Sequence, residues 1–333
     1  MAYTTIDNPE LYFQTKLYTG DGSATQAQTF DGSEDMQPDW VWIKSRSNAE
    51  AHSLTDSVRG VTKWLESNST AAEQTNANTM KAFGTDGFSV GLAGSVGDTG
   101  QTYVAWCWKE SATAGFDIVG FTGNATARNI SHNLSAIPEL IIIKNYSSSS
   151  SYWTSYHKPL GNTAELYLNS TDAAGGSVAS WNSTTPDSSN FRLGANTGVN
   201  GSGNSIIAYV FAPKQGFSKF GSYTGNANNN GPFVYTGFKP AFLLIKNATG
   251  NTEQWNIWDN KRQAYKNPNI TILQPSRTTT DNTGGDQAVD FLSNGFKVRY
   301  NSTEHNQSGE TMVYMAFAEA PFVNSNGVPC TAR

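Results

Sequence analysis

Few residues in this chain have the types and spacing that catalysis or metal binding needs. The histidines and cysteines fall in none of the short-spaced ligand patterns of metal sites, such as HxH, HExxH or CxxC. They are His52, His132, His157, His305, Cys107 and Cys330. The GxxxxGKS/T and strand-following GxGxxG motifs are also absent. We therefore expect no metal, no cofactor, no catalytic residue and two free thiols.

Two carboxylate pairs are the nearest approach to a glycosidase site. They are Asp35 with Asp39, and Asp286 with Asp290. Glycoside hydrolysis needs two carboxyl groups about 5 to 10 Å apart across the scissile bond. Both pairs stand in polar turns or on a short helical face, so we interpret them as solvated turn carboxylates.

Aromatic side chains give the only candidate binding residues. Three tryptophans, Trp40, Trp42 and Trp106, align with Leu140, Ile142 and Tyr209 of the repeat described below, which is typical of core positions. Tyr146, Tyr152 and Trp153 instead flank the serine run 147–151, where we expect an exposed loop. Aromatic faces in such a loop can stack on sugar rings. The alternative is that Trp153 packs beside the strand ends.

Four landmarks recur in the same order three times along the chain, and this repeat gives each candidate residue a place in one of three units. The first is an aromatic-Thr-Gly turn, the second a proline and a lysine separated by five mostly apolar residues, the third a phenylalanine after a polar turn, and the fourth a YVAW-like run. The prolines of the second landmark are Pro38, Pro138 and Pro240, about a hundred residues apart. Self-similarity at a fixed period indicates a repeat architecture.

Each repeat reads as a β-sandwich. Short runs rich in Val, Ile, Tyr, Phe and Trp alternate with Gly, Asn, Asp, Ser and Thr clusters, as in strands and turns. The run 140–143 is apolar on both faces, which fits a central strand covered on both sides. The best helical candidate is 286–292, which ends at an Asn-Gly turn signal. The sequence therefore predicts an all-β fold of three tandem jelly-roll or concanavalin-like sandwiches.

The predicted domains are residues 1–112, 113–214 and 215–333, called here the first, second and third repeats. The last strand of one repeat runs almost directly into the first strand of the next. Linkers this short predict repeats packed on one another as a rod, a triangle or a closed pseudo-trimer. Asp56 with Arg59 recurs as Asp259 with Arg262, where His157 stands in the second repeat, which suggests a shared structural salt bridge.

Charge and hydropathy exclude several partner classes. The net charge is −5, so no basic surface suited to nucleic acid is indicated. No secretion signal opens the chain, and no run of eighteen apolar residues suggests membrane insertion. The run 10–14, ELYFQ, is similar to a protease-tag site, but its phenylalanine falls in register with the later repeats, so we treat it as native.

Several stretches of the chain resemble a family of tailed-phage virion proteins common in marine phages. They are MAYTTIDNPELYFQTKLYTG, GSEDMQPDWVWIKSRS, DSVRGVTKWLESNST, GFSKFGSYTGNANNNGPFVYTGFKPAFLLIK and VYMAFAEAPF, and the resemblance spans essentially the whole chain. It implies a non-enzymatic structural protein with lectin-like sandwiches, often labelled a tail fibre. The family offers no agreed catalytic or binding residues to carry over.

Three functional readings stay open at this point. The first is a tail-fibre or receptor-binding protein that contacts host surface glycans or proteins. The second is a capsid decoration protein or head appendage, and the third is a hydrolase of surface polysaccharide. The first two imply a virion location after synthesis in the host cytoplasm, other virion proteins as partners, and a homo-oligomer, for which we predict a trimer.

Overall fold

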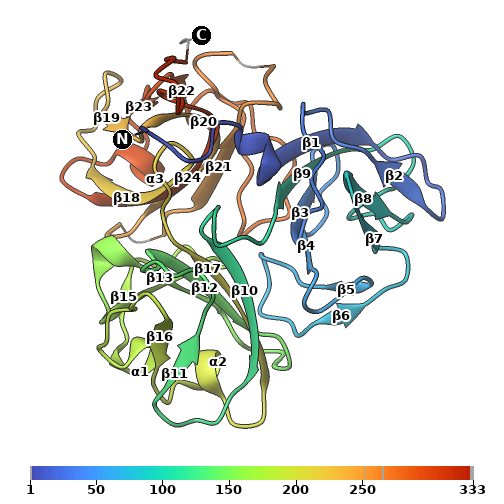
Figure 1. The fold of residues 1–333 in the computed structure, drawn as a ribbon, viewed down its shortest axis with the longest axis vertical. Coiled ribbons are helices and arrows are strands. Elements are labelled where there is room, and N and C mark those ends of the chain that lie inside the picture. The colour runs from blue at the N-terminus through green and yellow to red at the C-terminus, as the bar shows by residue number, and fades with distance from the viewer. Residues whose placement is uncertain (1, 251, 265, 331–333) are drawn as a thin grey trace.

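The computed structural model describes residues 2–250, 252–264 and 266–330, and its secondary structure is almost entirely antiparallel β. This confirms the predicted all-β sandwich class. Figure 1 shows three groups of strands, blue, green and orange, gathered around a common centre. Of the arrangements expected from the short linkers, the closed triangle is the one observed.

Each repeat contributes one large sheet with the same strand order. The first sheet runs β1 (Phe13–Thr19), β9 (Thr102–Trp108), β3 (Trp40–Ser45) and β4 (Ser53–Asp56). The second runs β10 (Phe116–Thr122), β17 (Ser205–Phe211), β12 (Leu140–Asn145), β13 (Trp153–His157), β14 (Ala164–Tyr167) and β15 (Gly175–Gly176). The third runs β18 (Ser218–Thr224), β24 (Thr311–Pro321), β20 (Phe238–Asn247) and β21 (Trp255–Asp259).

Smaller sheets cover the outer faces of the large ones. They are β2 (Gln26–Gln28), β8 (Gly87–Val90) and β7 (Met80–Gly84); β11 (Arg128–Ser131) and β16 (Asn190–Leu193); and β19 (Phe233–Tyr235), β23 (Gly295–Val298) and β22 (Val289–Leu292). The pair β5 (Lys63–Trp64) and β6 (Gln74–Thr75) lies next to β4, where Leu54 bridges to Leu65. The short helical turns are η1 (Pro9–Leu11), η2 (Lys158–Leu160), α1 (Val178–Trp181), α2 (Thr197–Asn200) and α3 (Thr303–Asn306).

The helix expected over 286–292 is wrong. Residues Val289–Leu292 form β22, which pairs with β23. Val289 and Phe291 are buried while Asp290 is half-buried, so the apolar side chains alternate with period two, which fits a strand with one buried face. The Asn-Gly signal at 294–295 does mark the connection between these two strands.

The inner faces of the three large sheets share one aromatic core. Trp40 of the first repeat stacks on Trp108 at 4.5 Å between ring centroids and on Tyr209 of the second repeat at 4.4 Å. Phe13 stacks on Phe317 of the third repeat at 5.4 Å. All five side chains belong to one buried cluster that crosses every repeat boundary. The prediction that the repeat-aligned tryptophans are core residues is confirmed.

Outer faces of the large sheets pack on the small sheets, which makes each repeat a two-layer sandwich. In the second repeat, Ile141 and Ile143 lie in a separate cluster with Phe191 and Leu193 of β16. Their neighbours Leu140 and Ile142 point the other way, into the shared core. The prediction that the strand over 140–143 is covered on both faces is therefore confirmed.

The connections between repeats are tight turns. Ser111 bridges to Phe116, and Lys214 bridges to Ser218. The predicted boundaries after residues 112 and 214 fall inside these turns. The core is continuous across these turns, and the division into three separate domains stays a prediction.

Buried ion pairs join neighbouring repeats. Arg59 Nε donates to Asp56 Oδ2 at 2.6 Å, and Tyr209 of the second repeat donates its hydroxyl to the same oxygen at 2.7 Å. In the third repeat, Arg262 and Asp259 form the equivalent pair, which accepts a hydrogen bond from Trp106 Nε1 of the first repeat at 3.1 Å. The predicted shared salt bridge is confirmed, and each copy also binds the next repeat.

Histidine takes the same junction role in the second repeat. His157 Nε2 lies 3.0 Å from the carbonyl oxygen of Tyr314 in the third repeat, and burial lowers its pKa to about 4. The unfolded-chain pKa is about 6.5. The unfolded chain therefore binds more protons between these two values, so this histidine's contribution to stability is present above pH ~6.5 and is lost as the pH falls towards ~4.

We expect the wild type to lose roughly 2.5 kcal/mol more stability than His157→Gln between pH 7 and pH 4.5, because each pH unit below ~6.5 contributes about 1.4 kcal/mol. Urea unfolding of both proteins at both pH values measures this difference. The comparison cancels the contributions of other titratable groups, including Glu110. Burial and a hydrogen bond with Asp117 raise the pKa of Glu110 to about 7. Equal losses in the two proteins would contradict the assignment.

Candidate functional site

The structure separates the three predicted binding residues. Trp153 is fully buried, and its indole Nε1 donates to the carbonyl oxygen of Glu66 in the first repeat at 2.8 Å. The expectation that Trp153 lies in an exposed loop is therefore wrong. Lys144 on β12 lies directly opposite it on β13, and this register turns the indole towards the shared core. Trp153 holds two repeats together and cannot meet a ligand there.

Tyr146 is half-buried and packs against the shared core. Its backbone is fixed on both sides, because its amide donates to the Ser205 carbonyl at 3.1 Å and its carbonyl accepts from the Glu73 amide at 2.8 Å. The residue therefore links the second repeat to the first. Its role in binding stays a prediction.

Tyr152 is the predicted residue that is exposed, with 45% of its surface accessible. Its ring stacks on that of Tyr167, with centroids 4.6 Å apart and planes inclined by 28°. Tyr167 ends β14, the strand next to β13, so the two side chains meet across the sheet. A stacked pair of this kind presents a flat apolar surface with hydroxyl groups at its edge.

A shallow cleft of about 230 Å³ opens beside this tyrosine pair. Its lining consists of hydroxyl, amide and glycine residues together with the two rings, and none of the lining residues carries a formal charge. They are Asn145, Ser148, Ser150, Ser151, Tyr152, Thr154, Tyr167, Asn196, Thr197, Gly198 and Asn204. Donors and acceptors arranged around aromatic rings can bind neutral polar ligands.

Second-repeat contacts hold the cleft in shape. Tyr167 donates its hydroxyl to Glu165 Oε1 at 2.5 Å, and Glu165 also accepts from the hydroxyl of Ser180. Burial, followed by the hydrogen bond to Glu165, raises the pKa of Tyr167, so the phenol stays protonated at neutral pH. Asn145 Nδ2 donates to the Thr197 carbonyl at 3.1 Å and ties β12 to α2.

Of the four carboxylates considered for hydrolysis, Asp35 and Asp286 are exposed, and the other two have structural partners. Asp39 Oδ2 accepts from the Glu110 amide at 2.8 Å, and Asp290 pairs with Arg299 at 3.5 Å. Across residues 2–250, 252–264 and 266–330, no group of three or more His, Cys, Asp or Glu side chains could hold a metal ion. Asp39 and Asp290 therefore stabilise connections between strands in the positions where the structure places them.

The sequence did not reveal Tyr167 or the α2 residues of the cleft. Tyr167 stands in an AELYLN run that looks like an ordinary strand, and Asn196 and Thr197 precede a turn rich in glycine and asparagine. The usable signal was the outward alternation of Tyr167 relative to Leu166 and Leu168, both buried. That signal is visible only once the strand has been placed.

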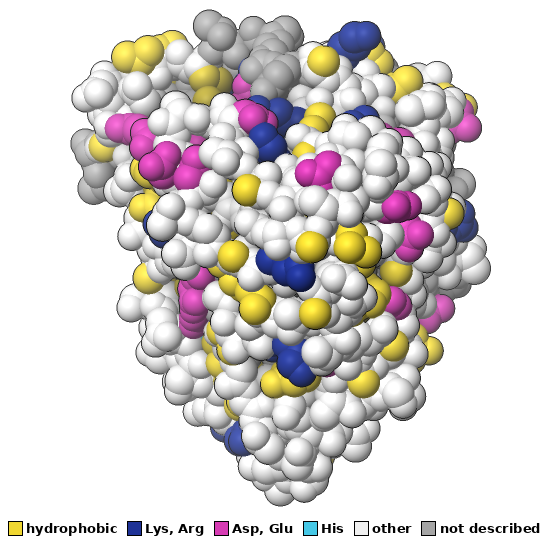
Figure 2. Space-filling view, turned by 90° about the vertical axis from the view of Figure 1, so that its right-hand side faces the viewer, with side chains coloured by type: hydrophobic (Ala, Val, Ile, Leu, Met, Phe, Trp, Pro, Cys, Tyr) yellow, Lys and Arg dark blue, Asp and Glu magenta, His cyan; other side chains and the backbone are white. Residues whose placement is uncertain are grey.

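Most of the surface is neutral and polar, in keeping with a charged content of 15%. Figure 2 shows one face on which isolated basic, acidic and hydrophobic groups are scattered over a largely uncharged surface. Among the described residues no helix is long and apolar enough to cross a membrane. The neutral cleft therefore resembles the wider surface in chemistry and differs from it in its exposed aromatic pair.

Comparison with known proteins gives a family without a function. No curated protein matches the chain. A family model described as a domain of unknown function, DUF7483, matches residues 8–321, a single match that covers all three repeats. The chain belongs to the DUF7483 family.

Proposed function

We propose that the protein is a non-enzymatic structural component of a tailed-phage particle, a tail-fibre or receptor-binding protein that contacts the host surface. The resemblance of the sequence to phage virion proteins supports the proposal that the protein is part of a phage particle. The neutral cleft at Tyr152 and Tyr167 is the observation that supports recognition, because it combines an exposed aromatic pair with uncharged donors and acceptors.

The chemistry of this cleft favours a neutral glycan of the host surface as its ligand. Sugar hydroxyls both donate and accept, as Ser, Thr and Asn side chains do. The C–H faces of a sugar ring can lie on the Tyr152 ring, which stands in solvent before binding. Because the rings are already stacked, little side-chain freedom is lost on binding.

Tyr152→Ala is expected to weaken binding of the protein to purified host-surface polysaccharide at least about tenfold, equivalent to ~1.4 kcal/mol. The matched control is Phe233→Ala on β19, which removes an aromatic ring that is 46% exposed, against 45% for Tyr152. Titration calorimetry with the isolated polysaccharide measures both. Wild-type affinity in Tyr152→Ala, or no binding by the wild type, would contradict recognition through this cleft.

Capsid decoration is the alternative function. Phe233 and Tyr235 are both exposed on β19 of the third repeat, and such neighbouring aromatic groups suit a contact with a shell protein. Cryo-electron microscopy of the particle separates the readings, because density at the tail supports recognition and density on the capsid supports decoration. The same maps count the copies, for which we propose a homotrimer that uses outer surfaces, since the inner sheet faces are already buried together.

A further inference from the structure

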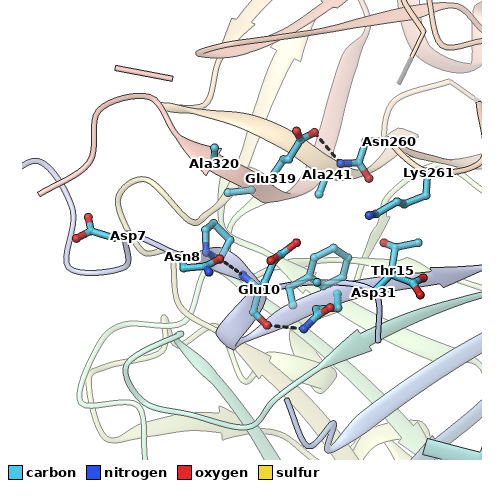
Figure 3. Close-up of a pocket in the computed structure, with 15 residues that line it drawn as sticks. Asp7, Asn8, Glu10, Thr15, Asp31, Ala241, Asn260, Lys261, Glu319 and Ala320 are labelled. Atoms are coloured by element: carbon cyan, nitrogen blue, oxygen red, sulfur yellow. Dashed lines mark hydrogen bonds between the residues drawn. The ribbon is translucent and has the colours of Figure 1, made fainter. Parts of the chain in front are cut away.

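A cleft of about 420 Å³ lies between the first and third repeats (Figure 3). One wall comes from η1, β1 and the turn at Asp31, and the other from the third-repeat strands β20 and β24 and the turn after β21. The residues that line it include Glu10, Thr15, Asp31, Ala241, Asn260 and Glu319. It is separate from the Tyr152 cleft, with which it shares no residue.

A sequence difference at the second landmark helps to open this cleft. The residue after the landmark proline is Asp39 in the first repeat, Glu139 in the second and Ala241 in the third. Asp39 binds the Glu110 amide, and Glu139 pairs with Lys158 at 2.6 Å. Ala241 has only a methyl group in this place, and it lines the cleft.

Two polar atoms in the cleft walls are buried without a hydrogen-bond partner among the described residues: Asn260 Oδ1 and Thr15 Oγ1. The side chains belong to residues that are only 6% and 8% exposed. Asn260 Nδ2 donates to Glu319 Oε2 at 2.7 Å, which fixes the amide so that Oδ1 is the free acceptor (Figure 3). An unsatisfied buried polar group costs about 1 to 3 kcal/mol, so two of them in one cleft point to a ligand that supplies their partners.

The charges around the cleft are largely compensated. Asp31 pairs with Lys16 at 2.6 Å and Glu319 with Lys239 at 3.0 Å. Glu10 Oε2 accepts from the amide and hydroxyl of Ser33 at 2.7 and 2.8 Å. The carboxylates that line the cleft do not form a metal-binding group among the residues described. Because acceptors, a hydroxyl and a lysine share the lining, a neutral ligand with several hydroxyl groups matches it better than a strongly charged one.

We propose that this cleft binds a saccharide unit, as a second site beyond the tyrosine cleft of the proposed function. A ligand hydroxyl donates to Asn260 Oδ1, and another exchanges a hydrogen bond with Thr15 Oγ1. Carboxylate oxygens of Glu10 and Asp31 accept from further hydroxyls, and the side chains of Phe13 and Ala241 lie against the C–H face of the ring.

Two variants test the site. Thr15→Val keeps the shape of the side chain and removes the unpaired hydroxyl, so the thermal midpoint should not fall. Ala241→Glu restores the side chain that the second repeat carries at this position and fills the cleft. The ligands tested are glucose, galactose and mannose, and spermidine is included to detect binding of a cation. Saturation-transfer NMR on the full chain measures the binding of each.

We expect at least one of these sugars to bind the wild type and Tyr152→Ala alike, and to bind Thr15→Val and Ala241→Glu at least about tenfold more weakly. Sugar binding that is lost in Tyr152→Ala and kept in both cleft variants would overturn this site while supporting the proposed function. No binding of any of the three sugars at millimolar concentration would also overturn it. So would binding of spermidine in preference to all three sugars, because the cleft would then be a cation site.

Discussion

Asp56→Ala is expected to lower the free energy of unfolding by about 3 to 5 kcal/mol, the range for breaking a buried ion pair on one side. The side chains of Asp56 and Arg59 are 0% and 1% exposed. Without the carboxylate, the Arg59 guanidinium keeps its bonds to the Leu54 carbonyl at 3.0 Å and to Glu73 at 3.3 Å but loses its closest partner. The Tyr209 hydroxyl of the second repeat loses its acceptor as well. Urea unfolding measures the change.

Two controls separate the ion pair from the contact between repeats. Tyr209→Phe removes only the hydrogen bonds between the Tyr209 hydroxyl and the ion pair, and should cost about 1.5 to 3 kcal/mol. Lys158→Ala breaks the pair with Glu139, in which the lysine side chain is 53% exposed, and should cost less than about 1 kcal/mol. A change in Asp56→Ala no larger than that in Lys158→Ala would show that the buried pair does not stabilise the junction.

Sequence reasoning succeeded where a pattern repeats. The strand-like runs and polar turns that recur in each repeat predicted the all-β class. The alignment of Trp40 with Leu140 predicted a core position, because a surface residue would not be replaced by an apolar one in register. The recurrence of Asp56 with Arg59 at Asp259 with Arg262 predicted the salt bridge. Both pairs are buried, as a shared structural role requires.

It failed where tertiary packing overrides local composition. A serine run beside Trp153 is typical of an exposed loop, yet closing the three sheets into a ring brings the first repeat over this residue, and Glu66 accepts from its indole. Composition around a single strand carries no information about a neighbouring repeat. The 286–292 segment failed for a related reason, since pairing with β23 outweighs a weak helical pattern.

The candidate sites show the same limit. Tyr152 was found because it flanks a polar run, but Tyr167 reaches it only through the pairing of β13 with β14. The cleft between the first and third repeats joins residues such as Thr15 and Asn260, which are far apart in sequence. The sequence shows that Ala241 stands where the other two repeats have an acidic residue. That Ala241 lines a cleft between two repeats is visible only in the folded structure.

An isolated second repeat, residues 113–214, is expected not to fold as a monomer. Its inner sheet buries Leu140, Ile142, Trp153, Tyr209 and Phe211 in the core that it shares with the other repeats, and all are at most 2% exposed. At about 1.5 to 3 kcal/mol for each large apolar side chain, exposing these five removes roughly 10 kcal/mol. That is comparable to the whole stability of a typical domain, about 5 to 15 kcal/mol.

Circular dichroism and sedimentation of this fragment, with the full chain as the control, measure the effect. The full chain should unfold in one cooperative transition, because a shared core couples the repeats. The fragment should lack near-ultraviolet signals from its buried aromatic groups, or acquire them only as it self-associates and buries the same face against further copies. A folded monomer with its own cooperative transition would mean that the small outer cluster around Phe191 is sufficient, and that the repeats are independent domains whose inner faces merely touch.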